Sequence, residues 1–272
     1  MARVIVITSG KGGVGKTTAT SNLGMALARL GHRTVLLDAD VGLRNLDLLL
    51  GLENRVIYTG LDVLNKSCRL EQALIQDKRQ PQLTFFPLSS SQSKDPITEL
   101  QIEELVDLIK NKYDFILIDS PAGIDDGFQI AIKPANEALI VVTPEVPSIR
   151  DADKVIGILL TQGIKNNQLI VNRIRPKMVK SDDMMSIVDV KNILGIPIVG
   201  VIPDSEQVII ASNRGEPLVL DDNLSLPGLA FENTARRLQG EDVEFLDLEN
   251  MTSKNPIKRV LKNLLNKKGQ DK

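Results

Sequence analysis

The sequence predicts an α/β fold, in which a single-domain, mostly parallel sheet is flanked by helices on both faces. Two observations predict this fold. Short apolar runs rich in β-branched residues alternate with longer segments of helical periodicity along the chain. The first run, Val4–Thr8, is apolar almost throughout, which is typical of a strand buried on both faces. With 42% hydrophobic and 25% charged residues in 272, the composition is that of an ordinary globular protein.

The alternation can be followed in order from the N-terminus. The expected strands after the first are Val35–Asp38, Leu83–Pro87, Phe115–Asp119, Ala138–Thr143, Leu169–Asn172 and Ile198–Ile202. The expected helices are Thr17–Leu30, Thr98–Lys112, Ser148–Gln162, Ser181–Leu194, Ser205–Arg214 and Leu226–Leu238. Strands that are separated by helices pair in parallel, because a parallel connection needs a crossover of a dozen or more residues. No low-complexity linker precedes residue 240, so we expect one domain over residues 1–240.

A glycine-rich loop joins the first strand to the first helix. Gly10, four residues, and then Gly15-Lys16-Thr17 give the spacing of a phosphate-binding loop in its strand–loop–helix context. Glycines let successive backbone N–H groups point at phosphate oxygens, next to a helix N-terminus whose dipole favours anions. Lys16 can reach the terminal phosphates, and the Thr17 hydroxyl can ligate Mg²⁺. The residues that we expect to bind phosphate are Gly10, Lys11, Gly12, Gly13, Val14, Gly15, Lys16, Thr17 and Thr18.

Two other expected strands end in carboxylates. Asp38 ends the second strand and is followed by Asp40, and Asp119 ends the strand Phe115–Asp119. The carboxyl ends of parallel strands form the edge at which open α/β sheets bind ligands. Carboxylates at that edge can hold metal-bound water or orient an attacking water. Together with the loop, they predict a nucleoside triphosphatase.

The run Lys-Gly-Gly-Val-Gly-Lys-Thr-Thr, residues 11–18, carries a second lysine after its first glycine. It resembles the deviant phosphate loop, or deviant Walker A motif, of the MinD/ParA family. The run Asp-x-Asp-x-Gly-Leu-Arg-Asn-Leu-Asp, residues 38–47, resembles the first switch region of the MinD members. The resemblance implies a P-loop ATPase that uses ATP and Mg²⁺ and works as a dimer with the nucleotides at its interface. It also implies that Lys11 reaches the nucleotide of the partner subunit.

The resemblance assigns roles to individual residues. It makes Lys11, Lys16 and Asp40 catalytic, with Asp40 placing the hydrolytic water. The residues that it places at the Mg²⁺ shell are Thr17, Asp38 and Asp119. In the second switch, the backbone N–H of Gly123 is expected to meet the γ-phosphate. The residues expected to flank the adenine are Asn172, Arg173, Pro203 and Asp204, and an asparagine side chain can both donate to and accept from a purine edge.

The C-terminal residues change sign. Residues 241–254 form an acidic linker, whereas residues 255–272 hold six basic residues and one acidic residue. Within 255–268, Asn255 and Pro256 suit a helix start, and five aliphatic residues fall within an arc of about 140°. These five are Ile257, Val260, Leu261, Leu264 and Leu265. A basic amphipathic helix is typical of a membrane-surface element, although a helix docked on the domain itself, or a solvated tail, stays open.

Such a helix binds lipid weakly on its own. Burial of five aliphatic side chains gives roughly 7–12 kcal/mol gross, but ordering the backbone costs roughly 1–2 kcal/mol per residue. Two tails on one dimer bind far better through effective concentration. If ATP makes the dimer, ATP also controls attachment to an anionic membrane surface.

The resemblance implies partners as well. An ATP-bound homodimer would recruit a MinC-like division inhibitor to the membrane. A MinE-like stimulator would then trigger hydrolysis and release. This cycle would select the site at which the division septum forms. No run of 18 or more apolar residues occurs, and Met1-Ala2-Arg3 leaves no room for a signal peptide before the first strand. We therefore expect a protein that is cytoplasmic and peripheral on the inner face of a bacterial membrane, or plastid stromal and on the inner envelope.

Two alternative functions compete with this one. A ParA-type DNA-partition ATPase needs a basic surface for DNA, whereas the first 254 residues are acidic overall. A nucleotide-binding scaffold without useful hydrolysis would not need Asp38, Asp40 and Asp119. The single cysteine, Cys68, excludes an internal disulfide and a paired-cysteine metal motif.

Overall fold

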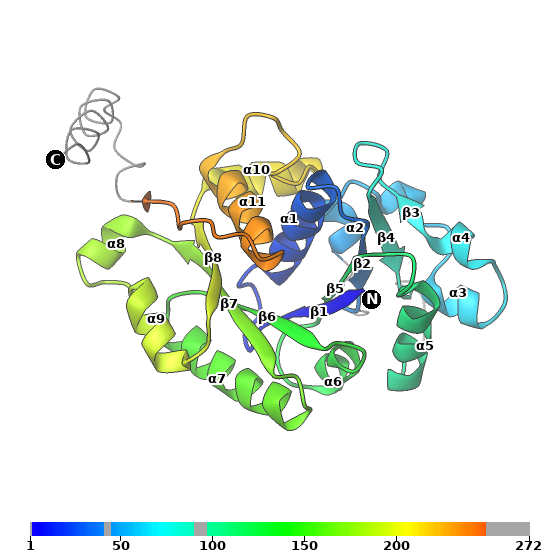
Figure 1. The fold of residues 1–272 in the computed structure, drawn as a ribbon, viewed down its shortest axis with the longest axis horizontal. Coiled ribbons are helices and arrows are strands. Elements are labelled where there is room, and N and C mark those ends of the chain that lie inside the picture. Colours follow the sequence, from blue (N-terminus) through cyan, green and yellow to red (C-terminus); the bar gives the residue numbers. More distant parts are fainter. Residues whose placement is uncertain (1, 41–44, 90–96, 249–272) are drawn as a thin grey trace.

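The computed structural model describes residues 2–40, 45–89 and 97–248, and within them it contains an eight-stranded sheet. The strand order is β3-β4-β2-β5-β1-β6-β7-β8 (Figure 1). The strands are β1 (Arg3–Thr8), β2 (Thr34–Asp38), β3 (Ile75–Gln76), β4 (Leu83–Pro87), β5 (Phe115–Asp119), β6 (Glu137–Val142), β7 (Asn166–Ile174) and β8 (Ile198–Pro203). Neighbouring strands are parallel except at the edge, where β3 runs antiparallel to β4. The predicted fold class is confirmed.

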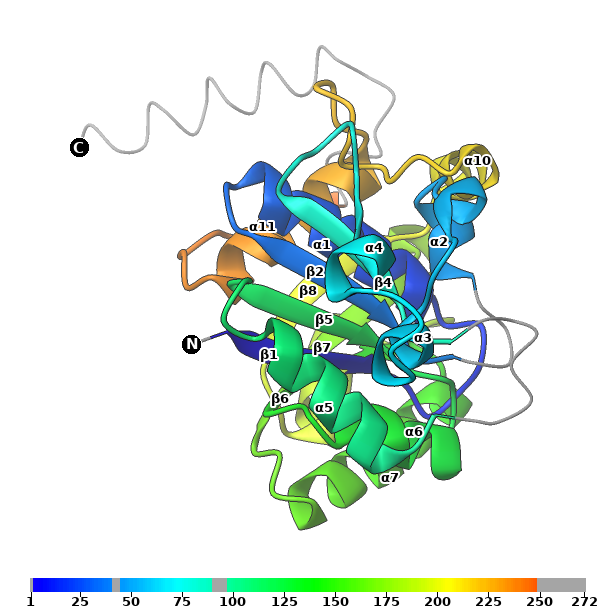
Figure 2. The same ribbon diagram turned by 90° about the vertical axis from the view of Figure 1, so that its right-hand side faces the viewer.

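Helices cover both faces of the sheet. Figure 2 shows α1 and α11 on one face and α5, α6 and α7 on the other. The helices are α1 (Lys16–Arg29), α2 (Leu46–Leu49), α3 (Gly60–Leu64), α4 (Leu70–Ala73), α5 (Glu99–Ile109), α6 (Asp126–Ile132), α7 (Val146–Thr161), α8 (Pro176–Lys180), α9 (Ile187–Leu194), α10 (Glu206–Arg214) and α11 (Leu226–Leu238), with a 3₁₀ turn at Glu53–Arg55. None of the helices in these ranges is both long enough and apolar enough to cross a membrane.

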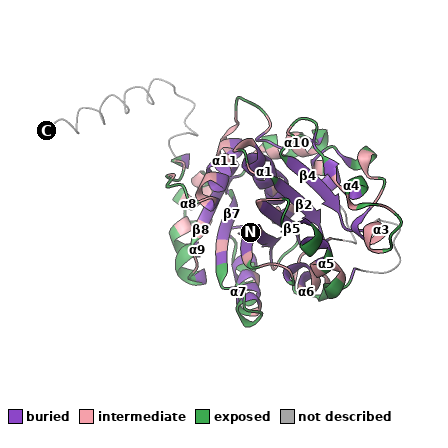
Figure 3. Ribbon diagram, turned by 45° about the vertical axis from the view of Figure 1, so that its right-hand side comes forward, coloured by how far each residue is buried: buried purple, intermediate pink, exposed green. Residues whose placement is uncertain are grey.

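Each face of the sheet has its own apolar core. Successive side chains of a strand point to opposite faces, so Val4 and Val6 of β1 pack toward α5, α6 and α7, whereas Ile5 and Ile7 pack toward α1 and α11. Both sets are apolar because both faces are covered. Figure 3 shows the strands buried between helices whose outer sides are exposed. The layered packing brings the carboxyl ends of β1, β2 and β5 to one edge.

One predicted helix begins later than expected, although its end is confirmed. We expected a helix over Ser181–Leu194, but the structure has the short helix α8, a turn, and then α9. Asp182 in the turn has φ 58°, which a helix does not allow. Ser186 then starts α9 by a capping box, in which its hydroxyl accepts from the Asp189 N–H and the Asp189 carboxylate accepts from the Ser186 N–H. The sequence analysis also missed β3, α2, α3, α4, α6 and α8, which are too short for a periodic pattern.

The chain after α11 stays on the domain as far as Leu248. The Arg237 guanidinium donates to the Val243 and Glu244 carbonyls at 2.6 and 2.8 Å and lies 4.1 Å from the Phe245 ring centre. Leu248 is buried against Ile174 and Val201. The expected membrane-binding residues, Ile257, Val260, Leu261, Leu264 and Leu265, lie outside the described residues. The acidic linker and the targeting helix stay predictions.

Candidate functional site

The glycine-rich loop runs from the end of β1 to the first residue of α1. Gly13 and Gly15 have φ 77° and 101°, a conformation that favours glycine. A Cβ on Gly10 would lie 2.5 Å from the carbonyl carbon of Asp151, so the backbone of α7 packs directly on the loop. Gly13 and Gly15 are therefore required by the backbone conformation, and Gly10 is required by close packing.

Hydrogen bonds hold the loop from several sides. The Ser9 hydroxyl donates to the Lys11 carbonyl at 2.8 Å, and the buried Asn172 amide donates to the Val14 carbonyl at 2.7 Å. The Gly123 N–H donates to the Ser9 carbonyl at 3.1 Å. These contacts fix the path of the backbone before any ligand binds, which lowers the cost of ordering it around an anion.

Two of the predicted carboxylates lie side by side below the loop. Asp38 of β2 and Asp119 of β5 are register partners on neighbouring strands, and each is only 2% exposed. Asp38 accepts from the backbone N–H groups of Asp40 at 3.1 Å and Leu46 at 3.2 Å. Asp119 accepts from the Thr20 hydroxyl at 2.9 Å. Asp38 and Asp119 therefore meet at the carboxyl edge of the sheet, and their role at a metal ion stays a prediction.

Burial makes this centre electrostatically unbalanced. The pKa of Asp38 is raised well above its usual value, first by burial and then by the Asp119 charge. Burial raises the pKa of Asp119 to about 6, although hydrogen bonds from Thr17 and Thr20 and the Lys16 charge oppose the rise. Burial also lowers the pKa of Lys16, against the pull of Asp119 and Asp40. Two buried carboxylates facing one buried ammonium favour an added cation.

The donors present fit a magnesium ion that keeps most of its ligands as water and phosphate. The Thr17 side chain is hydrogen-bonded to Asp119, at the first turn of α1. Among the described residues, no group of three or more His, Cys, Asp and Glu side chains is gathered closely enough to cage a metal. Mg²⁺ is usually held through one or two carboxylates, water and substrate phosphates rather than by an all-protein cage.

Other predicted residues lie at the rim of this centre. Lys11 is 43% exposed, and its Nζ lies 3.5 Å from Glu145 Oε2 at the start of α7. Asp40 is half-buried at the end of β2. The Gly123 N–H is bonded to the Ser9 carbonyl, so its expected contact with a γ-phosphate requires that this bond open. That contact stays a prediction.

The residues expected to flank adenine lie at the ends of two neighbouring strands, β7 and β8. Asn172 uses its amide on the loop and its Oδ1 on the Arg173 N–H, so the structure gives it a bracing role, and its contact with adenine stays a prediction. Arg173 is exposed and has φ 58°. Pro203 and Asp204 line a hollow of about 410 Å³ at the end of β8.

Sequence reasoning missed two residues of this region. Arg175 lines the same hollow, and its Nε donates to Asp204 Oδ2 at 2.6 Å. Only the pairing of β7 with β8 brings them together, so no sequence signal could have found the contact. Thr20 could have been found, because it lies four residues after Lys16 and hence on the same face of α1.

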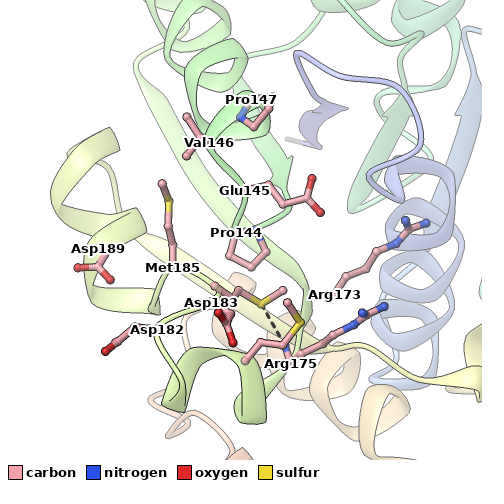
Figure 4. Close-up of a pocket in the computed structure, with 12 residues that line it drawn as sticks. Pro144, Glu145, Val146, Pro147, Arg173, Arg175, Asp182, Asp183, Met185 and Asp189 are labelled. Carbon is pink, nitrogen blue, oxygen red and sulfur yellow. Dashed lines mark hydrogen bonds between the residues drawn. The ribbon is translucent and has the colours of Figure 1, made fainter.

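A second hollow, of about 660 Å³, lies beside the first. Figure 4 shows Val146 and Pro147 of α7 on one side and Asp182, Asp183, Met185 and Asp189 on the other. Glu145, the ion-pair partner of Lys11, lies at its edge. The hollow therefore adjoins the predicted nucleotide site without containing any of its buried carboxylates.

Comparisons with known proteins agree with this geometry. The model of the CobQ/CobB/MinD/ParA nucleotide binding domain matches residues 5–218. A septum site-determining protein MinD of Emiliania huxleyi is 72% identical over 265 residues, which cover 97% of each chain. The chain belongs to the MinD family. Its predicted family membership is confirmed.

Solved structures of MinD proteins share the fold. The MinC:MinD cell division protein complex of Aquifex aeolicus matches with a TM-score of 0.83 and 51% identity, over 90% of this chain and 98% of that one. The Pyrococcus horikoshii MinD complexed with Mg-ADP matches with a TM-score of 0.79 and 30% identity, over 88% and 97%. These matches favour the MinD hypothesis over the DNA-partition alternative, and they confirm a nucleotide-binding P-loop fold.

Proposed function

We propose that this chain is a Mg²⁺-dependent ATPase that positions the division site by cycling on and off a membrane. The observation that carries the proposal is the buried centre of Lys16, Asp38 and Asp119 at the mouth of the phosphate loop. The Mg-ADP complex of the Pyrococcus horikoshii relative supports the choice of ligand.

Each residue of the centre has a task in hydrolysis. Lys16 and the loop N–H groups bind the β- and γ-phosphates, and Asp40 orients the attacking water. Thr17, Asp38 and Asp119 hold the Mg²⁺ shell, and Thr20 fixes the orientation of Asp119 by its 2.9 Å hydrogen bond. When bound, Mg²⁺ neutralises charge that develops on the phosphate oxygens.

The proposed dimer rests on Lys11. Its ion pair with Glu145 joins two exposed side chains over 3.5 Å, and such surface pairs contribute about 0–1 kcal/mol. Lys11 can therefore leave Glu145 at little cost and reach a nucleotide in a second subunit. Two tails would then face one membrane, and the dimer would bind it through effective concentration.

The proposed partners follow from the relatives. The Aquifex aeolicus MinD is in a complex with MinC, and this supports recruitment of a MinC-like division inhibitor by the ATP-bound dimer. A MinE-like stimulator would end the cycle by triggering hydrolysis. The place of action is the inner face of the cell membrane or, since the Emiliania huxleyi relative is algal, of a plastid envelope.

Hydrolysis is tested with Asp40→Ala. We expect turnover to fall by a factor of about 10² or more, because an oriented general base contributes that much. Titration calorimetry should show ATP affinity little changed, since the proposed task of Asp40 is to orient the attacking water rather than to hold the nucleotide. Glu103→Ala on α5 is the control and should hydrolyse ATP like the parent. Equal turnover by Asp40→Ala would leave the scaffold alternative standing.

Membrane attachment is tested by sedimentation with anionic liposomes. The full chain should pellet with ATP, stay in solution with ADP, and lose all pelleting when residues 255–272 are removed. Lys11→Ala should keep nucleotide binding and lose the ATP-dependent pelleting. Equal pelleting with ATP and ADP would contradict the proposal, and so would the absence of pelleting by the intact chain.

Recruitment is tested with the same liposomes and purified MinC. MinC should appear in the pellet only when the full chain and ATP are both present. MinC that pellets equally with ADP, or that stays in solution beside membrane-bound protein, would remove this step from the proposed cycle.

A further inference from the structure

The larger hollow is a groove that shares only Arg173 with the residues predicted to bind the nucleotide. We name it the methionine groove, and its walls include Val146, Asp182 and Asp183 together with Met178, Met184 and Met185. Its volume of about 660 Å³ lies within the range of ordinary ligand sites. Figure 4 shows the acidic side chains on the α8–α9 side, facing the start of α7.

The lining has a recognisable chemistry. Three of the six methionines of the chain line this one groove. Methionine is unbranched and polarisable, so a methionine surface adapts to aliphatic side chains of different shapes. A groove whose apolar lining comes from methionines, Val146 and two prolines suits the apolar face of an amphipathic helix.

The charge of the rim selects a basic ligand. Four carboxylates and two guanidiniums line the groove. Of these, Arg175 is paired with Asp204, and Glu145 is paired with Lys11. The charge that remains is negative, because three carboxylates then stand against the single guanidinium of Arg173. These carboxylates are Asp182, Asp183 and Asp189. Complementary charge guides docking and fixes its register.

The described chain ends next to this groove. Leu248 packs in a small cluster with Ile174 and Val201, and Met184, which lines the groove, packs against the same cluster. Eight residues, 249–256, separate Leu248 from Ile257. Fully extended, they span up to about 28 Å. The basic apolar run that follows can therefore reach the groove of its own chain.

We propose that the methionine groove holds the chain's own C-terminal segment, residues 255–268, whenever that segment is not on a membrane. Its aliphatic residues, Ile257, Val260, Leu261, Leu264 and Leu265, would lie on the methionines. The basic residues Lys258, Arg259 and Lys262 would face Asp182 and Asp183. The groove and the lipid would compete for the same apolar face.

The consequence is an autoinhibited anchor. A single subunit keeps residues 255–268 in the groove. The affinity of a monomer for lipid, which is already low, is therefore reduced by this competition. Docking itself does not depend on lipid binding, but this consequence rests on the proposed membrane function. It deepens that function, because release of the tail becomes a step that precedes attachment.

Disulfide trapping in the full chain tests the docking. In a Cys68→Ser background, Met185→Cys is combined with Leu264→Cys and mild oxidation is followed at dilute protein with ADP. The matched pair combines Leu264→Cys with Leu100→Cys, an exposed leucine (78%) on α5, which lies at the opposite end of the sheet (Figure 1). We expect the groove pair to close within one chain about tenfold faster, because tethering raises effective concentration.

Two charge variants show whether the acidic rim matters. Asp182→Asn with Asp183→Asn should slow closure of the groove pair about fivefold at low salt, and asparagine tolerates the positive φ of residue 182. Glu103→Gln with Glu104→Gln on α5 removes the same charge elsewhere and should change nothing. If Met185→Cys does not fold, Val146→Cys replaces it, since Val146 is 66% exposed on the opposite wall.

Equal closure rates for the groove pair and the α5 pair would overturn the docking. So would disulfides that form mainly between chains at high dilution, because the groove would then hold the tail of another copy. Liposome sedimentation separates the two proposals. With ADP, Asp182→Asn with Asp183→Asn should pellet more than the parent. Fast closure in a chain that never pellets would leave the docking standing and remove the membrane function.

Discussion

The two halves of the carboxyl edge are built differently. On the phosphate side, at the ends of β1, β2 and β5, Lys16, Asp38 and Asp119 are buried, and the two carboxylates accept hydrogen bonds from their surroundings. On the other side, at the ends of β7 and β8, Arg173, Arg175 and Asp204 are exposed, and both hollows lie there. One half is closed and charged, and the other is open and partly apolar.

The difference shows how the site divides its work. A triphosphate with Mg²⁺ presents the same charges every time, so a fixed and buried set of donors and carboxylates suits it. Other contacts must form and break, such as those with the adenine base, the C-terminal segment or a partner protein. Such contacts need less free energy to break where the side chains are exposed to water. Variants in the closed half should therefore change the free energy of unfolding or nucleotide binding strongly, whereas variants in the open half should change them little.

The largest effect is expected from Gly10→Ala. The added Cβ would meet the backbone of Asp151 at 2.5 Å, so the loop or α7 has to move, and overpacking of this kind costs about 3 kcal/mol. Gly12→Ala is the matched variant, because its Cβ would lie 3.9 Å from Ala122. Urea unfolding and nucleotide titration should show a large loss for the first and a small one for the second. Similar losses would mean that the loop is not packed as described.

Next in size is Asp119→Asn, which should stabilise the nucleotide-free protein. The folded pKa of Asp119 is about 6 against an ordinary 3.8. The charged form is therefore disfavoured in the folded state, and the penalty grows as pH rises from about 4 to 6. Removing the charge should add up to about 3 kcal/mol at pH 7.5, and the gain should largely vanish by pH 4. A gain that does not change with pH would contradict the burial argument.

Asn172→Ala should cost somewhat less, about 1.5 kcal/mol, because the Val14 carbonyl loses its donor inside the protein. Nucleotide affinity should fall with it, as the loop loses a brace. Asn166→Ala is the control on the same strand, since Asn166 is exposed and bonds to Glu137 at the other end of β7. Thermal unfolding with and without nucleotide distinguishes the two variants.

The smallest effect is expected in the open half. Arg175→Ala removes the 2.6 Å ion pair with Asp204, in which the arginine side chain is 58% exposed. Exposed pairs contribute about 0–1 kcal/mol, so the free energy of unfolding should fall by less than about 1 kcal/mol and by still less at high salt. A loss as large as that of Asn172→Ala would erase the contrast between the halves.

By itself, the sequence determined the alternation of strands and helices along the chain, the phosphate loop and the carboxylates at the strand ends. These features are local: a spacing of glycines, a Lys-Thr pair, and an apolar run that stops at Asp38 or Asp119. It also predicted the family, because the second lysine lies within the same eight residues. Of the predicted helix 181–194, only the first part was wrong: Asp182 takes a positive φ in a turn, and the helix starts after its cap at Ser186.

The tertiary structure alone decided what surrounds these residues. Parallel pairing of β2 with β5 sets Asp38 beside Asp119. Burial raises the pKa of both carboxyls, and the Asp119 charge raises the pKa of Asp38 further. Packing of α7 on the loop explains Gly10, and pairing of β7 with β8 joins Arg175 to Asp204. The methionine groove arises from α7, α8 and α9 together. These contacts join residues far apart in the chain, and their energies depend on burial, which no local pattern specifies.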